Sequence, residues 1–137
     1  MSVLKIKNIS KSYKLIDVVK NISMEINSGE VVGLLGPNGA GKTTAFYIIV
    51  GLVKADEGSI FLDEKNITEL SMHKRSKLGL GYLPQEASIF RKLTVEENIL
   101  AILEYRNDLS LPEREHELDQ LLEELHISHV RKSMGIN

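Results

Sequence analysis

Residues 30–44 read EVVGLLGPNGAGKTT, and this stretch decides the fold class. Within it, Gly36–Thr43 matches the pattern G-x-x-x-x-G-K-S/T without exception. The match is preceded by a short, nearly continuous apolar run, Glu30–Leu35, which is typical of a strand buried on both faces of a parallel sheet. The run that follows, KTTAFYIIVGL, favours a helix. Strand, glycine-rich loop and helix are the context that a phosphate-binding P-loop requires, so the sequence predicts a P-loop here.

The residue types in this loop suit a nucleoside triphosphate. Backbone N–H groups of a tight loop can converge on phosphate oxygens, and a helix N-terminus favours anions. We expect Lys42 to act on the β- and γ-phosphates as a catalytic group. We expect the Thr43 hydroxyl to be a Mg²⁺ ligand, because hard cations prefer oxygen. The predicted phosphate contacts are Gly36, Pro37, Asn38, Gly39, Ala40, Gly41, Lys42, Thr43 and Thr44.

Composition places the chain among soluble globular domains. It has 137 residues, a net charge of −2, no cysteine, 42% hydrophobic residues and 26% charged residues. The near-neutral balance gives no electrostatic indication of nucleic-acid binding. The longest apolar stretch, Ala45–Val53, is too short to span a bilayer, and the N-terminus lacks the apolar run of a secretory signal. These features favour a cytoplasmic protein, and a P-loop alone leaves the class of NTPase open.

Hydrophobic periodicity outlines the remaining strands. Val3–Ile9 and Asn21–Ile26 alternate between apolar and polar residues, as half-exposed antiparallel strands do. Gly58–Ile67 predicts two short strands around the polar turn Asp63–Asn66. Gly79–Pro84 predicts a further strand.

Helical signals dominate after this point. Thr94 and Glu97 form a capping-box pattern ahead of one helix, and Ser110 with Glu113 marks the start of another. The basic cluster at residues 74–77 is expected to be a solvated surface.

The extended string GLLGPNGAGKTT resembles the Walker A segment of ABC ATPases. Two other positions match the same family, and the resemblance implies their roles. Tyr13 lies where ABC ATPases place an aromatic that stacks on the adenine ring, although a tyrosine could also fill a strand edge. Gln85 matches the Q-loop glutamine, which completes the Mg²⁺ shell or contacts the attacking water; the alternative is a surface glutamine.

Residues 81–91, GYLPQEASIFR, resemble the ATPase subunits of lipopolysaccharide-export ABC transporters. In this family the region forms a groove that receives the coupling helix of a membrane subunit. Phe90 and Arg91 are therefore candidate partner-coupling contacts, since an aromatic beside a cation is common at interfaces. Ordinary core packing is the alternative for Phe90.

The resemblance implies an α/β fold, the N-terminal portion of a P-loop NTPase of the ABC ATPase type. It would combine an antiparallel β subdomain with a partial parallel-sheet core, followed by a helical subdomain. We expect residues 1–85 to form the nucleotide-binding core and residues 86–137 to form the helical subdomain, both incomplete. The Glu30–Leu35 strand would then lack some of its sheet neighbours.

A second nucleotide motif, the Walker B strand, is not identified in the sequence. Ile60–Glu64 ends in Asp-Glu as a Walker B strand does, but the apolar run is short and Asp63–Asn66 is typical of a hairpin turn. The LSGG signature, the Walker B strand and the switch histidine of the resembled family are also missing. We therefore expect the 137-residue chain alone to be inactive as an ATPase.

The predicted function is the ATP-binding subunit of an ABC transporter, an ATPase that uses ATP and Mg²⁺. The resemblance implies a homodimer that binds two membrane-spanning subunits at the inner face of the cytoplasmic membrane and powers export, with lipopolysaccharide as the cargo. The alternatives are the ATPase of a branched-chain amino-acid importer, a soluble ABC-type ATPase that acts on nucleic acid or ribosomes, and a non-catalytic nucleotide-binding fragment. The absence of a basic stripe argues against nucleic acid as a partner.

Overall fold

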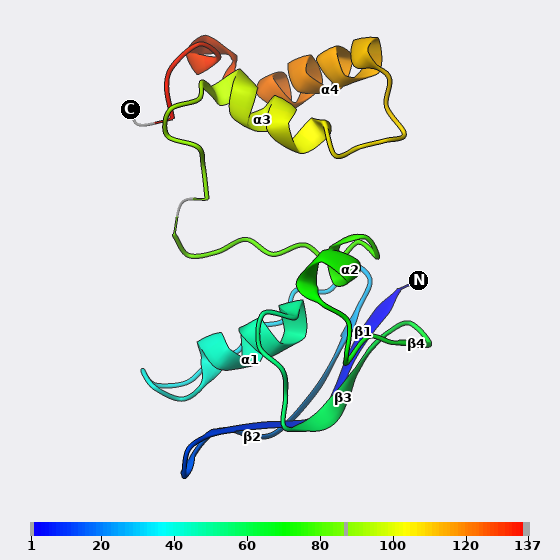
Figure 1. Cartoon of the computed structure of the whole chain (residues 1–137), viewed down its shortest axis with the longest axis vertical. Coiled ribbons are helices and arrows are strands. Elements are labelled where there is room, and N and C mark those ends of the chain that lie inside the picture. Colours follow the sequence, from blue (N-terminus) through cyan, green and yellow to red (C-terminus); the bar gives the residue numbers. More distant parts are fainter. Residues whose placement is uncertain (1, 87, 136–137) are drawn as a thin grey trace. The chain divides into compact units, whose positions relative to one another are not determined.

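Four antiparallel strands form one sheet in this computed structural model, which describes residues 2–86 and 88–135 (Figure 1). The spatial order of the strands is β2-β1-β3-β4. Their bounds are Val3–Tyr13 for β1, Ile16–Asn27 for β2, Glu57–Leu62 for β3 and Lys65–Asn66 for β4. The sheet belongs to the first of two compact units, Met1–Leu83 and Pro84–Asn137.

The first unit builds its core between this sheet and helix α1, Lys42–Val50. In the middle of the sheet, Ile6 of β1 pairs with Met24 of β2 and with Ile60 of β3. Every second residue of these strands faces inward and packs against one side of α1, as the alternating sequence pattern predicts. The buried cluster consists of Ile6, Ile9, Val19, Ala45, Ile48, Ile49, Ile60 and Ile67.

Three predicted strands are confirmed, and so is the predicted hairpin, but its turn is shorter than expected, because Lys65 and Asn66 form β4 and pair with β3. The first two lie within β1 and β2, which extend further than the alternation indicated. Asp63 has a left-handed φ of 56° in the turn between β3 and β4, and its Oδ1 accepts a hydrogen bond of 2.8 Å from the Val3 N–H. The Asp63 carboxylate is therefore part of a turn, as its polar surroundings predicted.

The two strands predicted at Glu30–Leu35 and Gly79–Pro84 are wrong for the described residues. Neither segment pairs with a strand, and the side chains of Val31, Leu35 and Leu83 are almost fully exposed. Apolar composition was enough to predict burial, but a strand also needs neighbouring backbone to bond with, and none pairs with these segments in the described chain. The antiparallel sheet and the helices of the predicted fold class are confirmed, whereas residues 2–86 and 88–135 form no parallel sheet.

Arg75, in the short helix α2 (Met72–Ser76), is a second correction. Its basic cluster was expected to be solvated, but only 3% of Arg75 is exposed. Its guanidinium donates hydrogen bonds to four carbonyl oxygens at 2.6–2.9 Å. Two of them are at the end of α1, where a cation also complements the helix dipole. The acceptors belong to Ile48, Ile49, Thr68 and Leu70.

The second unit contains α3, Val95–Leu103, α4, Leu111–Glu124, and the 3₁₀ helix η1, Ser128–Val130. The predicted capping box at Thr94 with Glu97 is confirmed, and so is the predicted helix start at Ser110, where Ser110 and Glu113 also form a capping box. The small core holds Leu103, Leu118 and Leu122. None of the helices in the described part of the chain is long and apolar enough to cross a membrane.

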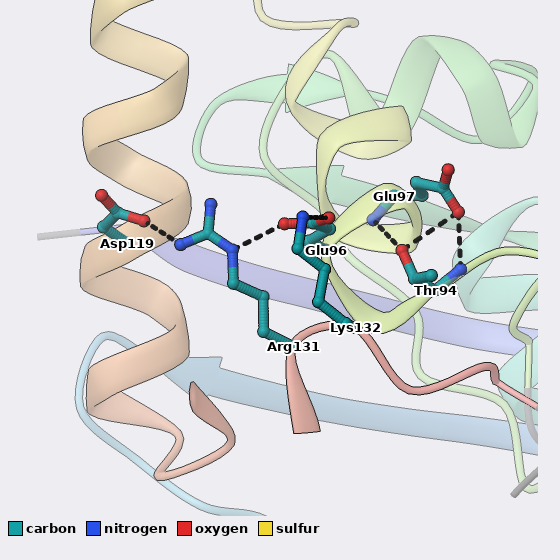
Figure 2. Close-up of polar contacts among 6 residues, drawn as sticks. All are labelled: Thr94, Glu96, Glu97, Asp119, Arg131 and Lys132. Carbon is teal, nitrogen blue, oxygen red and sulfur yellow. Dashed lines mark hydrogen bonds and ion pairs between the residues drawn. The ribbon is translucent and has the colours of Figure 1, made fainter. Parts of the chain in front are cut away.

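An ion-pair cluster ties the segment after η1 to the two helices of the second unit (Figure 2). Arg131 bridges two carboxylates, with Nε 2.6 Å from Oε2 of Glu96 and Nη1 2.7 Å from Oδ1 of Asp119. Lys132 also donates to Glu96. Backbone bonds reinforce this arrangement, since the N–H groups of Val95 and Glu96 donate to carbonyls of residues 133 and 131.

Candidate nucleotide-binding site

The P-loop leads into α1, and no side chain caps the backbone N–H groups at the start of this helix. Gly41 is the N-cap residue of α1, and no side-chain cap hydrogen bond is formed there. The first turn of α1 also carries no acidic residue. A helix start with uncapped N–H groups, its positive dipole end and no carboxylate is a site for an anion.

Position 41 requires glycine, because of both its backbone conformation and the close approach of a neighbouring strand. Its φ is +81°, a left-handed conformation in which side chains are strained. A Cβ at this position would lie 2.0 Å from the backbone oxygen of Val18 in β2. Gly39 has a similar φ of +83°, but nothing lies within 4 Å of a Cβ added there. The close approach to β2 thus seats the loop on the sheet at Gly41.

Lys42 folds back over its own loop. Its Nζ donates hydrogen bonds to the carbonyl oxygens of Gly36 at 2.6 Å and Pro37 at 2.7 Å. The Pro37 oxygen also accepts from the Ala40 N–H at 3.2 Å. The bonds from Lys42 and Ala40 therefore hold the two ends of the loop close together and keep the loop curved.

The donors of this loop fit a nucleoside triphosphate with Mg²⁺. Uncapped N–H groups at the start of α1 and the Lys42 ammonium supply positive charge and hydrogen-bond donors for phosphate oxygens. Thr43 is exposed, so its hydroxyl is an accessible oxygen ligand for a hard cation. Thr44 is half-buried in the same turn.

Tyr13 belongs to the same unit and is connected to the loop through a hairpin. It is the last residue of β1 and pairs with Ile16, the first residue of β2. Two residues further along β2, Val18 contacts Gly41. Tyr13 is 47% exposed, and the Lys11 ammonium lies 5.5 Å from the centroid of its ring. One hairpin therefore carries the predicted base-stacking ring and also supports the phosphate loop.

Gln85, Phe90 and Arg91 belong to the second unit and are exposed. The Phe90 side chain is not core, because 60% of it is exposed. Its backbone is fixed by Asn98, whose side chain accepts from the Phe90 N–H at 2.7 Å and donates to the Phe90 oxygen at 3.0 Å. Ala87, within the segment that suggested lipopolysaccharide export, lies outside the described residues.

Sequence reasoning missed Lys11, which lies over the Tyr13 ring, and Asp56, which bonds to Lys11. Lys11 precedes Tyr13 by two positions in one strand, and this spacing alone could have indicated that they share a face. Asp56, which bonds to Lys11 at 2.6 Å, is 45 residues away in the chain, and no local pattern indicates the pairing.

Comparison with known proteins extends these observations. The family model described as "ABC transporter" matches residues 19–135. The chain is 56% identical over 135 residues to the "Lipopolysaccharide export system ATP-binding protein LptB" of Haemophilus influenzae, which covers 98% of this chain and 56% of that protein. The chain therefore spans little more than half the length of this curated relative.

Two solved structures are similar in fold. One is MJ1267, an ATP-binding cassette of an ABC transporter in its ADP conformation, with a TM-score of 0.82, 27% identity, and coverage of 100% of this chain and 59% of that chain. The other is the dimeric post-hydrolysis state of the ATP-binding cassette MJ0796 bound to ADP and Pi. Its TM-score is 0.77 at 29% identity, with coverage of 96% of this chain and 61% of that chain.

Proposed function

Since the chain belongs to the ABC transporter family, we propose that its uncapped P-loop binds ATP with Mg²⁺ in the ATP-binding subunit of a transporter. The observation that carries this proposal is the start of α1, where free N–H groups and the Lys42 ammonium gather with no carboxylate among them. The ADP-bound cassettes to which the chain is similar support the choice of nucleotide.

In this proposal, each site residue of the first unit has a defined part. The N–H groups of residues 39–43 hold phosphate oxygens, and Lys42 exchanges its two loop carbonyls for the β- and γ-phosphates. The Thr43 hydroxyl binds Mg²⁺, and Tyr13 stacks on the adenine ring. When bound, MgATP supplies the phosphoanhydride bond whose cleavage releases free energy for transport. Lys42 stabilises the negative charge that develops there.

Residues of the second unit transmit the state of the nucleotide. Gln85 completes the Mg²⁺ shell or contacts the attacking water, and exposed Phe90 and Arg91 contact a membrane-spanning subunit. The proposed nucleotide-binding core is residues 1–85 and the helical subdomain is residues 86–137, a boundary two residues after the one between the two compact units. The subunit acts as a homodimer at the cytoplasmic face of the membrane, as the dimeric cassette bound to ADP and Pi supports.

Lipopolysaccharide export is the proposed transport process, supported by 56% identity to LptB of Haemophilus influenzae. Affinity purification of the tagged protein from detergent-solubilised membranes tests the partners. We expect two membrane-spanning subunits of a lipopolysaccharide exporter to copurify. Copurification with amino-acid permeases would reject lipopolysaccharide as the cargo and leave the ATP site unaffected.

The ATP site is tested by calorimetric titration of the chain with MgATP. Lys42→Ala is expected to weaken ATP binding at least tenfold, which corresponds to about 1.4 kcal/mol. Lys65→Ala, which removes an exposed lysine of β4 in the same unit, is the matched control and should leave affinity unchanged. Equal ATP affinity of the Lys42→Ala variant and the parent chain would reject the proposed site.

A further inference from the structure

A lysine lies over one face of the predicted base-stacking ring. Lys11 and Tyr13 are two residues apart in β1, so their side chains share a face of the sheet. The Lys11 Nζ is 5.5 Å from the centroid of the Tyr13 ring, which is within the range of a cation–π interaction. Because the ammonium occupies one face, a nucleobase would stack on the opposite face, and Tyr13 as a residue is 47% exposed.

This lysine is itself held by a carboxylate from a distant part of the chain. The Asp56 Oδ1 lies 2.6 Å from the Lys11 Nζ, and its Oδ2 accepts a 2.8 Å hydrogen bond from the Ser12 N–H. The Asp56 N–H in turn donates to the Ser10 oxygen at 2.9 Å. These bonds surround the end of β1, and the Lys11 side chain is only 16% exposed. The lysine is therefore fixed between Asp56 and the ring.

The charge state of Asp56 agrees with this geometry. The hydrogen bond from Lys11, followed by that from the Ser12 N–H, lowers the pKa of the Asp56 carboxyl below its usual value of 3.8. The carboxylate is therefore ionised at neutral pH and remains a partner for the ammonium.

We propose that Lys11, anchored by Asp56, is a positioning residue that fixes the Tyr13 ring for stacking on the base of a bound nucleotide. This inference rests on the proposed ATP-binding function. A ring that is already oriented loses less conformational freedom when a base stacks on it, so binding is tighter. Lys11 contributes to recognition of the base and not of the phosphates, because its ammonium is occupied by Asp56 and Tyr13.

The chain provides a matched control on the same strand. The Lys7 Nζ lies 5.2 Å from the centroid of the Phe61 ring, a contact of the same kind and nearly the same length. Lys7 is in the middle of β1 and its aromatic partner is in β3, so this pair does not include the stacking ring. Loss of the Lys7 contact reports the general effect of removing a cation–π interaction from β1.

The test compares two ligands that differ in possession of a base. Titration of the full chain with MgATP and with magnesium tripolyphosphate measures recognition with and without adenosine. Lys11→Gln is expected to weaken ATP binding about fivefold and leave tripolyphosphate binding unchanged. Lys11→Arg, which keeps the cation, should restore ATP affinity to within about twofold of the parent chain. Lys7→Gln should change neither affinity.

The outcomes separate this inference from the proposed function. Equal losses for both ligands in Lys11→Gln would show a general structural role and overturn the inference, and so would unchanged ATP binding in a chain where Tyr13→Ala weakens it. If Tyr13→Ala leaves ATP affinity unchanged, the stacking role of Tyr13 is wrong, and the positioning role of Lys11 falls with it. Circular dichroism spectra that match the parent chain verify that each variant is folded.

Discussion

Two arginines show how differently the two units are held together. Arg75 of the first unit is 3% exposed and bonds to four backbone carbonyls, while the Arg131 side chain of the second unit is 34% exposed and bonds to two carboxylates. The first arrangement supplies hydrogen bonds to buried and part-buried backbone carbonyls, and among these the Ile48 oxygen also accepts from the Gly51 N–H. The second joins a partly exposed arginine to the largely buried Glu96 and to the exposed Asp119, and ion pairs at exposed positions contribute little individually.

The difference follows from the size of the cores. In the first unit a sheet and α1 enclose eight buried residues, so its polar groups must be satisfied inside the fold. In the second unit three leucines are buried, and capping boxes and ion pairs define where segments begin and meet. We therefore expect the first unit to be sensitive to steric and hydrogen-bond defects, and the second to pH.

The largest effect is expected from Gly41→Ala, which tests the steric sensitivity of the first unit. The new Cβ would lie 2.0 Å from the Val18 oxygen at a φ of +81°, so the loop or β2 must move. We expect a loss of at least about 4 kcal/mol in the free energy of unfolding, measured by urea denaturation. Gly39→Ala has a similar φ but open space and should cost about 1 kcal/mol. Equal losses would mean that strain in φ, and not the contact with β2, decides the effect.

The pair of variants Arg75→Met and Arg131→Met compares the two arginines directly. Arg75→Met removes this donor from four carbonyls, two of them in buried hydrogen bonds and two in part-buried ones, so the expected loss is about 3 kcal/mol. Arg131→Met should cost clearly less, because the Asp119 side chain is 60% exposed and can turn to water, while Glu96 keeps Lys132 as a partner. Thermal unfolding followed by circular dichroism measures both variants. A larger loss for Arg131→Met would reverse the comparison.

The next effect is the pH dependence of the second unit. Hydrogen bonds from Arg131, and then from Lys132, lower the pKa of Glu96 below its usual 4.5. Because the folded pKa is lowered, this stabilisation is complete above about pH 4.5 and is lost as the pH falls through the folded value. Glu96→Gln should be less stable than the parent chain at pH 7 and should have a flatter dependence of the melting temperature on pH below 4.5. Parallel profiles for the two proteins would exclude Glu96 as the titrating group.

The smallest effect is expected from Lys132→Gln. The Lys132 side chain is 77% exposed and shares Glu96 with Arg131, which keeps the carboxylate paired when Lys132 is removed. The melting temperature at pH 7 should change less than in Glu96→Gln. A loss as large as that of Glu96→Gln would indicate that the cluster depends on Lys132.

The predictable features of this chain are those encoded over short distances. The P-loop and both capping boxes depend on spacings of three to eight residues, and the sequence contains them whole. Arg75 could not be predicted as buried, because its acceptors Ile48 and Ile49 precede it by 27 and 26 residues. The error at Glu30–Leu35 has the same origin, since an apolar run indicates that a strand is possible but does not supply its partner.

The closed loop at Lys42 has a consequence for the speed of ligand capture. The Lys42 Nζ bonds to the oxygens of Gly36 and Pro37, so the loop's own side chain holds its curve. An incoming anion replaces these two carbonyls as the partner of the Lys42 ammonium. This exchange needs only rotation of the Lys42 side chain, a motion of picoseconds to nanoseconds. Ordering of a flexible segment would take nanoseconds to microseconds. We therefore expect the rate at which a phosphate ligand binds this loop to be set by its diffusion to the start of α1 and not by rearrangement of the backbone.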